Sequence, residues 1–550
     1  MCFEVRESDL LGRIGVVKTK SGRFETPALL PVVNPAIQVV SPRELHERLG
    51  FEAIITNAYI IMKHFGQEAV EKGIHALLGF PGVVATDSGA YQLLVYGRVD
   101  VRPEEVVAYQ EDLGSDIATI LDVPTGWTDS REEALRTVLE TARRGRELWS
   151  LRRREDVLWI GPVQGGRFTD LVARSAELMG ELPFHIHALG SPVPVMEAYR
   201  FDVLVDMILA AKLHLPPERP LHLFGAGHPM MFSLAVALGC DTFDSAAYAI
   251  FARDGRYMTE AGTARLEELA YFPCSCPVCA KYEPSELLEM PERERVRLLA
   301  MHNLYACLRE LRFIKQAIRE GSLWELLMLR AHAHPSLLKA ARKLASYSDV
   351  LEERSPVARK RGTFIFSSAD LARPEVVRFR KRLLKRFSTP KSALLLLLPY
   401  PPERPFSRSP HYDRLLSALS GLGELARDVQ VCLYTLPFGL VPLELDQVHP
   451  LSQHEFAGAD EGILRWAVEL AADFVRSKPS RAVLLVSDGS ELAEELEVKL
   501  REACGCEGKP LLVLRRANPW SEESLRSIVA ALAELAKGRH PSKLFTGLGE

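Results

Sequence analysis

The stretch Val83-Val-Ala-Thr-Asp-Ser-Gly89 joins a short apolar run to a carboxylate, and this arrangement decides how the first part of the chain folds. An apolar run that ends at Asp87 and a glycine predicts a buried strand followed by a loop. The same pattern returns up to about residue 260, between longer amphipathic stretches such as 131–151. Expected strands lie at 53–56, 83–86, 117–121, 158–161, 186–189, 203–205 and 221–224, with a weaker one near Cys240.

Eight strand candidates that alternate with helices predict an α/β fold, namely a (β/α)8 barrel, with a doubly wound sheet as the alternative. The carboxyl ends of barrel strands meet on one face, where active sites lie, so polar residues at those ends indicate a site. Asp, Asn and Gly are also common in turns and caps, and only their recurrence favours this interpretation. The strand-end residues are Asn57, Asp87, Asp122, Gln164, Gly190, Gly225 and the stretch 241–244.

The composition is that of a globular protein, with 550 residues, 47% hydrophobic and 25% charged. It excludes collagen-like, low-complexity and wholly disordered chains. The net charge of −4 argues weakly against a nucleic-acid partner. The longest apolar run, 393–398, is too short to cross a bilayer, the first residues do not resemble a signal peptide, and nine cysteines are too few for a disulfide scaffold. We therefore expect a cytoplasmic protein with no membrane partner.

Composition divides the chain into three parts. Residues 1–350 hold the barrel, with a mostly helical, cysteine-containing subdomain over about 260–350. Residues 351–390 carry 11 Lys and Arg against 4 Asp and Glu and are expected to form a basic linker. Such a tract suits either contacts with nucleic-acid phosphates or a solvated helix face. In residues 391–550, apolar strand-like runs again alternate with helical stretches, which predicts a smaller doubly wound α/β domain. The expected strands lie near 393–398, 429–436, 481–487 and 510–515.

Three thiols crowd into six residues, Cys274-Ser-Cys276-Pro-Val-Cys279, and His302 follows in an amphipathic stretch. Three thiolates and one imidazole form a closed tetrahedral set for Zn²⁺, which leaves no open position for a reacting water. We therefore predict one structural zinc ion. His332 and His334 are alternative fourth ligands, although both lie farther from the thiols and just before Pro335.

Two carboxylate motifs lie on the expected catalytic face, Asp87-Ser-Gly89 and Asp241-Thr-Phe-Asp244. Paired carboxylates suit substitution at a sugar anomeric carbon, where one attacks and the other carries a proton to and from the leaving group. Spacing alone is weak evidence, since a single carboxylate near a strand end usually caps a helix or forms an ion pair.

Taken together, these motifs closely resemble the archaeal tRNA-guanine transglycosylases. The resemblance extends from about residue 3 to residue 350. It rests on the segments 12–15, 25–28, 55–57, 87–89, 121–125, 164–165, 222–229, 243–245 and 271–279. The family is a (β/α)8 barrel with an inserted zinc site. It exchanges guanine at position 15 of the tRNA D-loop for 7-cyano-7-deazaguanine (preQ0), on the way to archaeosine.

The resemblance also implies roles for individual residues. Asp244 would be the nucleophile and Asp87 the general acid and base. Asp122, Gln164, the Gly190 backbone and Ser88 would bind the base, and Tyr91 is a candidate for stacking on it. The zinc ligands would be Cys274, Cys276, Cys279 and His302, and the expected partners are tRNA, guanine, preQ0 and a second copy of the chain.

Two features depart from the family pattern. Archaeal members often carry a PUA RNA-binding domain, and no PUA-like segment is evident. Residues 391–550 instead loosely resemble a domain of archaeosine synthase, but Tyr400 stands where that family carries a cysteine. Two other functions remain open: a non-catalytic tRNA-binding paralogue, and an unrelated barrel hydrolase with catalytic zinc. The presence of both Asp87 and Asp244 disfavours the first, and the closed Cys3His set disfavours the second.

Overall fold

The computed structural model describes residues 2–90, 101–358 and 360–538. The chain divides into two compact units. The first comprises Met1–Ser346 and Arg354–Lys360, and the second comprises Tyr347–Glu353 and Arg361–Glu550.

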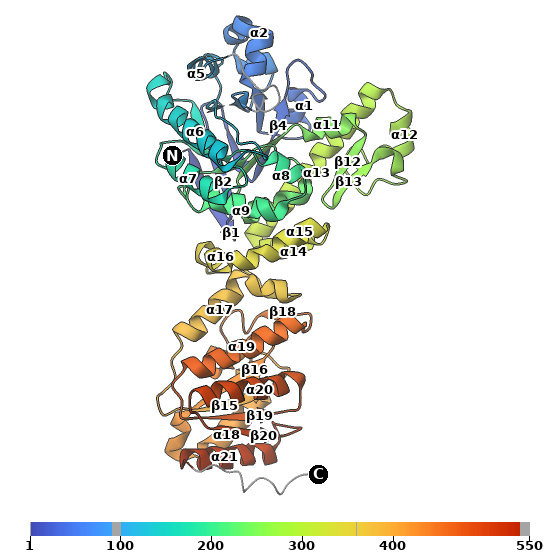
Figure 1. Cartoon of the computed structure of the whole chain (residues 1–550). Coiled ribbons are helices and arrows are strands. Elements are labelled where there is room, and N and C mark those ends of the chain that lie inside the picture. The colour runs from blue at the N-terminus through green and yellow to red at the C-terminus, as the bar shows by residue number, and fades with distance from the viewer. Residues whose placement is uncertain (1, 91–100, 359, 539–550) are drawn as a thin grey trace. The chain divides into compact units, whose positions relative to one another are not determined.

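The first unit is a closed barrel of eight parallel strands, which confirms the predicted (β/α)8 fold (Figure 1). In order around the barrel the strands are β10 (Leu221–Leu223), β11 (Thr242–Ser245), β4 (Ala28–Val33), β5 (Ala53–Asn57), β6 (Val83–Asp87), β7 (Ile117–Thr119), β8 (Leu158–Val163) and β9 (Ile186–Leu189). Helices such as α6 (Arg131–Leu151) and α7 (Thr169–Gly180) lie outside them. The capping box of Ser130 and Glu133 sets the start of α6.

One predicted strand is wrong, and one barrel strand was not among the predictions. Residues 203–205 lie inside helix α9 (Phe201–Lys212), which is buried on several sides, and a short apolar run cannot distinguish such a helix from a strand. The eighth strand is β4 instead, which closes the barrel between β11 and β5. Pro31 interrupts its strand pattern, since proline cannot donate a ladder hydrogen bond.

Apolar side chains fill the amino end of the barrel. One buried apolar cluster contains the first residues of three strands, Ala53, Val83 and Ile117. It also contains apolar residues farther along the barrel strands. An antiparallel sheet of β1 (Phe3–Asp9), β2 (Gly12–Lys18) and β3 (Arg23–Thr26) adds Phe3 and Phe24 to that cluster. The amino end is thus a packed core, which leaves the carboxyl end for a site.

The cysteine-containing insertion follows the last barrel strand. It consists of the hairpin β12 (Arg256–Thr259) and β13 (Gly262–Arg265), helix α12 (Pro284–Glu289) and the long helix α13 (Glu292–Glu320), which lie together in Figure 1. The buried Asn303 of α13 accepts from the Met258 amide at 2.9 Å and donates to the Arg256 carbonyl at 3.2 Å. Helix α13 therefore holds the hairpin through its backbone.

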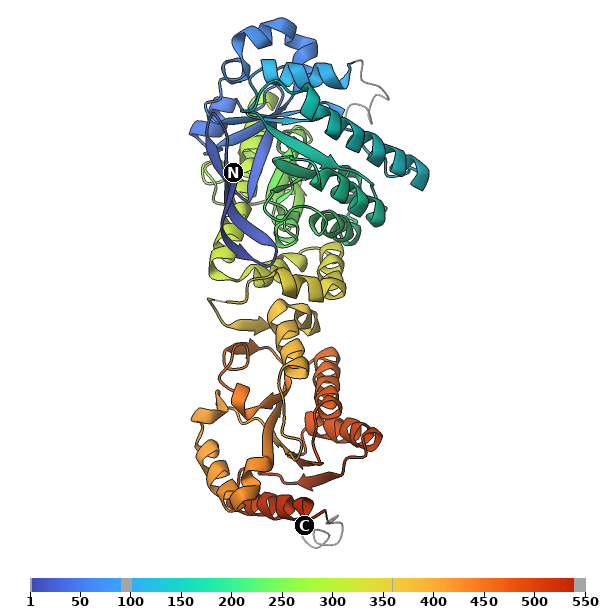
Figure 2. The ribbon, with the colours of Figure 1, turned by 90° about the vertical axis from the view of Figure 1, so that its left-hand side faces the viewer.

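The second unit confirms the predicted doubly wound α/β domain. Its sheet has the order β17 (Gly439–Pro442), β16 (Val429–Thr435), β15 (Leu394–Pro399), β19 (Ala482–Ser487) and β20 (Leu511–Arg515). On one side of this sheet, helix α18 (Pro410–Ser420) contacts helix α21 (Glu522–Ala536). On the other side, α19 (Glu461–Ser477) contacts α20 (Glu491–Cys506) (Figure 2). The antiparallel edge strand β17 was not among the predicted strands.

The tract 351–390, expected to be a basic linker, contains regular structure. Most of α16 (Ser348–Arg354), all of β14 (Thr363–Ile365) and all of α17 (Pro374–Lys385) fall in it. Strand β14 pairs with β18 (His454–Phe456). Arg373 and Arg378 are buried and form ion pairs with Glu375 and Glu352. These two arginines are therefore paired with carboxylates inside the second unit.

Within the described ranges, none of the helices is both long and apolar enough to cross a membrane.

Candidate functional site

A cavity of about 1040 Å³ opens at the carboxyl ends of the barrel strands. Its lining includes seven of the residues singled out at strand ends, although they are scattered over some 190 positions of the sequence. These are Asn57, Asp87, Asp122, Gln164, Gly190, Gly225 and Asp244. The closed barrel brings them together because each lies near or just past the carboxyl end of a different strand.

Asp244 lies on β11 and is held through a single carboxylate oxygen. Its Oδ1 accepts from the Gly225 amide at 2.8 Å and lies 3.0 Å from His222 Nε2. His222 comes from the neighbouring strand β10 and is only 2% exposed. No role for His222 follows from the sequence pattern, because a lone histidine in a buried strand is more often a packed core residue.

Asp87, at the end of β6, accepts a hydrogen bond from Asn57 Nδ2 of the adjacent strand at 3.1 Å. Burial raises the pKa of Asp87 to about 7, and the charges of Asp122 and Asp244 add to the rise. The backbone amides of Gly89 and Ser88 oppose it. A carboxyl group with this pKa holds and releases a proton near neutral pH, as a general acid and base must.

Asp122 and Gln164 form a polar pair on one wall of the cavity. Gln164 Nε2 donates to Asp122 Oδ2 at 2.5 Å, while Gln164 Oε1 accepts from the Thr125 amide and from Ser191 Oγ, both at 3.0 Å. The Thr125 amide can only donate, so it identifies the oxygen of the Gln164 side chain. Burial raises the pKa of Asp122 to about 6, against the hydrogen bond from Gln164.

Gly190 lies directly against this pair. A Cβ atom at position 190 would come within 2.2 Å of Gln164 Nε2, so any larger residue would displace the Gln164 amide. The Gly190 amide donates to the Val163 carbonyl at 2.8 Å and is thus already used within the barrel. The next residue, Ser191, has a φ of 60°, which is strained for a residue with a side chain and typical of functional sites.

Two of the residues singled out in the sequence lie elsewhere. Ser88 is fully buried and does not line the cavity. Asp241, at the amino end of β11, forms a buried ion pair with Arg13 at 2.5 Å and accepts from the Leu221 amide at 2.8 Å. It joins the sheet β1–β3 to the barrel, and the carboxylate of the 241–244 stretch at the cavity is Asp244. Tyr91 lies outside the described residues.

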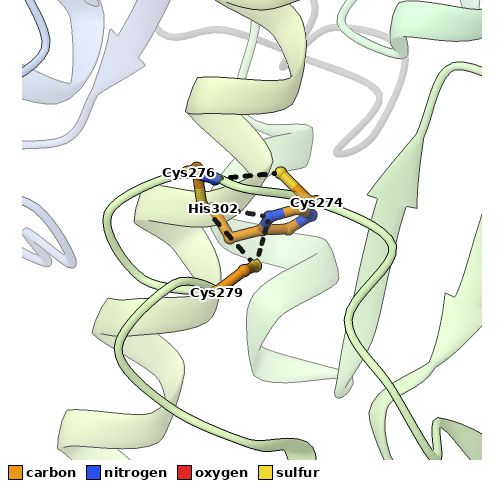
Figure 3. A group of neighbouring side chains, drawn as sticks. All are labelled: Cys274, Cys276, Cys279 and His302. Carbon is orange, nitrogen blue, oxygen red and sulfur yellow. Dashed lines mark hydrogen bonds between the residues drawn. The ribbon is translucent and has the colours of Figure 1, made fainter.

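Cys274, Cys276, Cys279 and His302 form a group that could hold a metal ion (Figure 3). One ligand atom from each lies within 4.8 Å of all the others. His302 is therefore the fourth member, and the alternatives lie elsewhere, with His332 bonded to the Met328 carbonyl and His334 capping helix α15 (Pro335–Lys343).

The surroundings orient His302 for metal binding. Its Nε2 donates to the Met258 carbonyl at 3.0 Å, which leaves Nδ1 without a proton and facing the sulfurs. The Tyr257 ring stacks on the imidazole with centroids 3.6 Å apart, and the Tyr257 hydroxyl lies 3.4 Å from Cys279 Sγ. No cavity-lining residue belongs to this group, so the candidate metal site and the cavity are separate.

Comparison with known proteins identifies the class to which this barrel and cavity belong. Residues 8–336 match the family described as queuine tRNA-ribosyltransferase. The chain belongs to this family of tRNA-modifying enzymes. Residues 376–532 match a second family, described as a domain of unknown function.

Three archaeal relatives share a more specific name within this family. All are named tRNA-guanine(15) transglycosylase. The protein of Aeropyrum pernix is 51% identical over 68% of this chain and 74% of its own length. That of Methanocaldococcus jannaschii is 44% identical over 83% and 68%, and that of Pyrococcus abyssi is 48% identical over 69% and 65%. The resemblance to archaeal tRNA-guanine transglycosylases is thereby confirmed.

Proposed function

We propose that this protein exchanges guanine at position 15 of the tRNA D-loop for 7-cyano-7-deazaguanine, through a covalent enzyme–tRNA intermediate. The observation that carries the proposal is the cavity, which holds Asp87 and Asp244 together with the polar pair Asp122 and Gln164. The family match and the names of the relatives support the coarser part of the proposal, the exchange of guanine in tRNA.

In the first step, a carboxylate oxygen of Asp244 forms a bond to ribose C1′ of the bound nucleotide. The bond from C1′ to guanine N9 breaks, and its electron pair leaves with the base. Asp87, with a pKa of about 7, supplies the proton that neutralises the departing guanine. The products are free guanine, an Asp244–ribosyl ester and ionised Asp87.

The second step reverses the first with a different base. The incoming 7-cyano-7-deazaguanine loses its N9 proton to Asp87 and attacks C1′, and the ester bond to Asp244 breaks. Both carboxylates return to their starting states, so the exchange consumes no other reactant. Two displacements at C1′ retain its configuration.

Base selection follows from the polar pair. Guanine and 7-cyano-7-deazaguanine share an edge with N1–H and N2–H donors beside the O6 acceptor. The Asp122 carboxylate accepts from such donors, and the free N–H of Gln164 donates to such an acceptor. The two bases differ at position 7, which lies away from this edge. A base without the matching groups would leave buried polar atoms unpaired and is rejected.

A zinc ion fits the Cys3His group, since three thiolates and an imidazole nitrogen form its preferred closed set. When bound it supplies structure, because it ties the loop 274–279 to α13. The tRNA phosphates contact residues of the tract 351–390, above all the exposed cations of α17. The chain acts as a homodimer.

The experiment that tests the function is exchange of radiolabelled guanine into tRNA, with and without guanine at position 15. Wild-type protein incorporates the label only into tRNA that has guanine at position 15, and added preQ0 displaces the label. Asp244→Ala abolishes incorporation. Tight tRNA binding without exchange would favour a non-catalytic paralogue. Unchanged exchange in Asp244→Ala would remove that residue from the nucleophile's role.

A further inference from the structure

We propose that His222 is a positioning residue of the exchange reaction, which holds Asp244 by Oδ1 and so presents Oδ2 to the ribose. The inference rests on the proposed function, because it concerns how the nucleophile of that reaction is oriented. It gives a functional role to a buried histidine that would otherwise be interpreted as a packed residue of the barrel core.

The direction of the His222 side chain follows from the strand register. His222 pairs with Ala188 of β9, which belongs to the apolar cluster inside the barrel. Side chains alternate along a strand, so His222 points inward as well. His187, one residue before Ala188, packs against Phe184 with ring centroids 6.1 Å apart and does not line the cavity. The chain thus offers a second buried barrel histidine outside the site.

Both nitrogens of the His222 ring are occupied by residues of β11. Nδ1 lies 2.9 Å from Thr242 Oγ1, and Nε2 lies 3.0 Å from Asp244 Oδ1. An ionised carboxylate only accepts, so Nε2 carries the hydrogen and Nδ1 accepts from the Thr242 hydroxyl. Thr242 and Asp244, two positions apart, point to the same side of the strand. The imidazole is therefore fixed in both tautomer and orientation.

A second donor acts on the same oxygen. The Gly225 amide reaches Asp244 Oδ1 at 2.8 Å from a backbone with a φ of 68°. A Cβ atom at position 225 would approach Val193 Cγ2 to 2.4 Å, so this conformation requires glycine. Within the described part of the chain, Oδ2 of Asp244 accepts no hydrogen bond. Two donors on one oxygen prevent the carboxylate from rotating and leave the other oxygen to react.

The orientation matters because attack at C1′ requires the oxygen to face the ribose at short range. A carboxylate that rotates freely spends most of its time in unproductive directions. Loss of the His222 donor therefore lowers kcat and leaves the KM for tRNA nearly unchanged, since tRNA binding does not involve it. A purely structural histidine would instead lower the stability alone.

The test compares His222→Leu, which removes the donor, with His222→Gln, whose amide nitrogen takes the place of Nε2. The expected kcat for guanine exchange falls roughly 10- to 100-fold in His222→Leu, the effect of losing a hydrogen bond to a charged group. It stays within about 5-fold of wild type in His222→Gln. The KM for tRNA changes by less than about 3-fold in both. His187→Gln controls for the loss of a buried barrel histidine and keeps wild-type kcat in its folded fraction.

Equal kcat in His222→Leu and wild type, or equal losses in His222→Leu and His222→Gln, would overturn the inference. Should His222→Leu fail to fold, Thr242→Val decides, because it frees the ring without touching Asp244. Its kcat is expected to fall by roughly 3- to 10-fold, and an unchanged kcat would count against the positioning role. Failure of the proposed function is distinguishable, since wild-type protein would then show no exchange and Asp244→Ala no loss.

Discussion

Gln164 Nε2 donates to Asp122 Oδ2 at 2.5 Å, which joins the ends of two neighbouring barrel strands inside the cavity. The Thr125 amide fixes the Gln164 oxygen on the opposite side. The pair therefore presents one remaining amide hydrogen and a carboxylate to a ligand. This fixed order of donor and acceptor is what the proposed base recognition requires.

Replacement of Gln164 by Leu is expected to raise the KM for guanine by roughly 10- to 100-fold, because the buried Asp122 and the base each lose a partner. The KM is measured by guanine exchange at saturating tRNA. Gln110→Leu is the matched control, since Gln110 is equally buried but bonds the Thr119 carbonyl at 2.9 Å and does not line the cavity. It should cost stability with the KM unchanged, and an unaltered KM in Gln164→Leu would contradict the base-binding role.

Replacement of Asp87 by Asn is expected to abolish exchange and to stabilise the protein at neutral and alkaline pH. The Asp87 pKa rises from 3.8 to about 7 on folding, mainly through burial. Between these values the folded state binds more protons than the unfolded state, so the contribution of Asp87 to stability falls as pH rises. The gain in Asp87→Asn grows from pH 4 to pH 7, up to about 4 kcal/mol, and is constant above. Denaturant unfolding across pH measures it.

Asp116→Asn provides the opposite case. Burial acts to raise the pKa of Asp116, but hydrogen bonds from His75, Ser21 and the Val84 amide lower it overall. Its contribution to stability is therefore present above the unfolded pKa and is lost as pH falls through the folded pKa. Asp116→Asn should destabilise the protein at neutral pH. The absence of a gain in Asp87→Asn would refute the raised pKa of Asp87, and a gain in Asp116→Asn would refute the lowered pKa of Asp116.

Replacement of Cys279 by Ser is expected to lower the zinc content below one ion per chain and to destabilise the insertion. Cys279 Sγ lies 3.3 Å from His302 Nδ1, so its loss opens the closed ligand set. Metal analysis and hydrogen exchange over 256–290 measure the change, and chelation should act in the same way. Exposed Cys506, replaced by Ser, serves as the control with normal zinc. Loss of turnover with normal hydrogen exchange would instead indicate a catalytic metal.

Replacement of Arg382, Lys385 and Arg386 by Gln is expected to weaken tRNA binding and to reduce its salt dependence. These side chains are exposed at the carboxyl end of α17, and no ion pair involves them among the described residues. Each lost phosphate contact lowers the slope of log Kd against log salt by roughly 0.7–0.9. Binding is measured by filter retention from low to high salt.

The control for this triple variant replaces Arg465, Arg501 and Lys537 by Gln. These exposed cations of the same unit form ion pairs with Glu461, Glu497 and Glu534. Their loss should leave the salt slope unchanged. Equal slopes in the two triple variants would assign the α17 cations to a solvated helix face.

Much of the fold could be predicted from residue order. The strands that end at Asn57 and Asp87 are read from local polarity, since a buried strand must be apolar and a loop need not be. Two errors share one cause: residues 203–205 and β4 are both apolar runs whose local pattern does not state whether they join a sheet. Pairing around the barrel decides that.

The metal group was also predictable, because Cys274, Cys276 and Cys279 are close in sequence and only a single distant ligand had to be chosen. The sequence could not predict which of the two carboxylates, Asp241 or Asp244, faces the cavity. The two carboxylates are only three positions apart in the sequence, yet they lie at opposite ends of one strand. Asp241 forms the ion pair with Arg13 at the amino end, and Asp244 lines the cavity at the carboxyl end.

By itself the sequence determined that strands alternate with helices, which carboxylates follow them, and which thiols could share a metal ion, since these depend on neighbours along the chain. Only the tertiary structure decided which polar atoms face one another. His222 and Asp244 meet because the closed barrel sets β10 against β11, and the pKa of Asp87 rises because burial withdraws it from water beside two other carboxylates. Hydrogen-bond distance and burial are properties of packed elements, and no local pattern contains them.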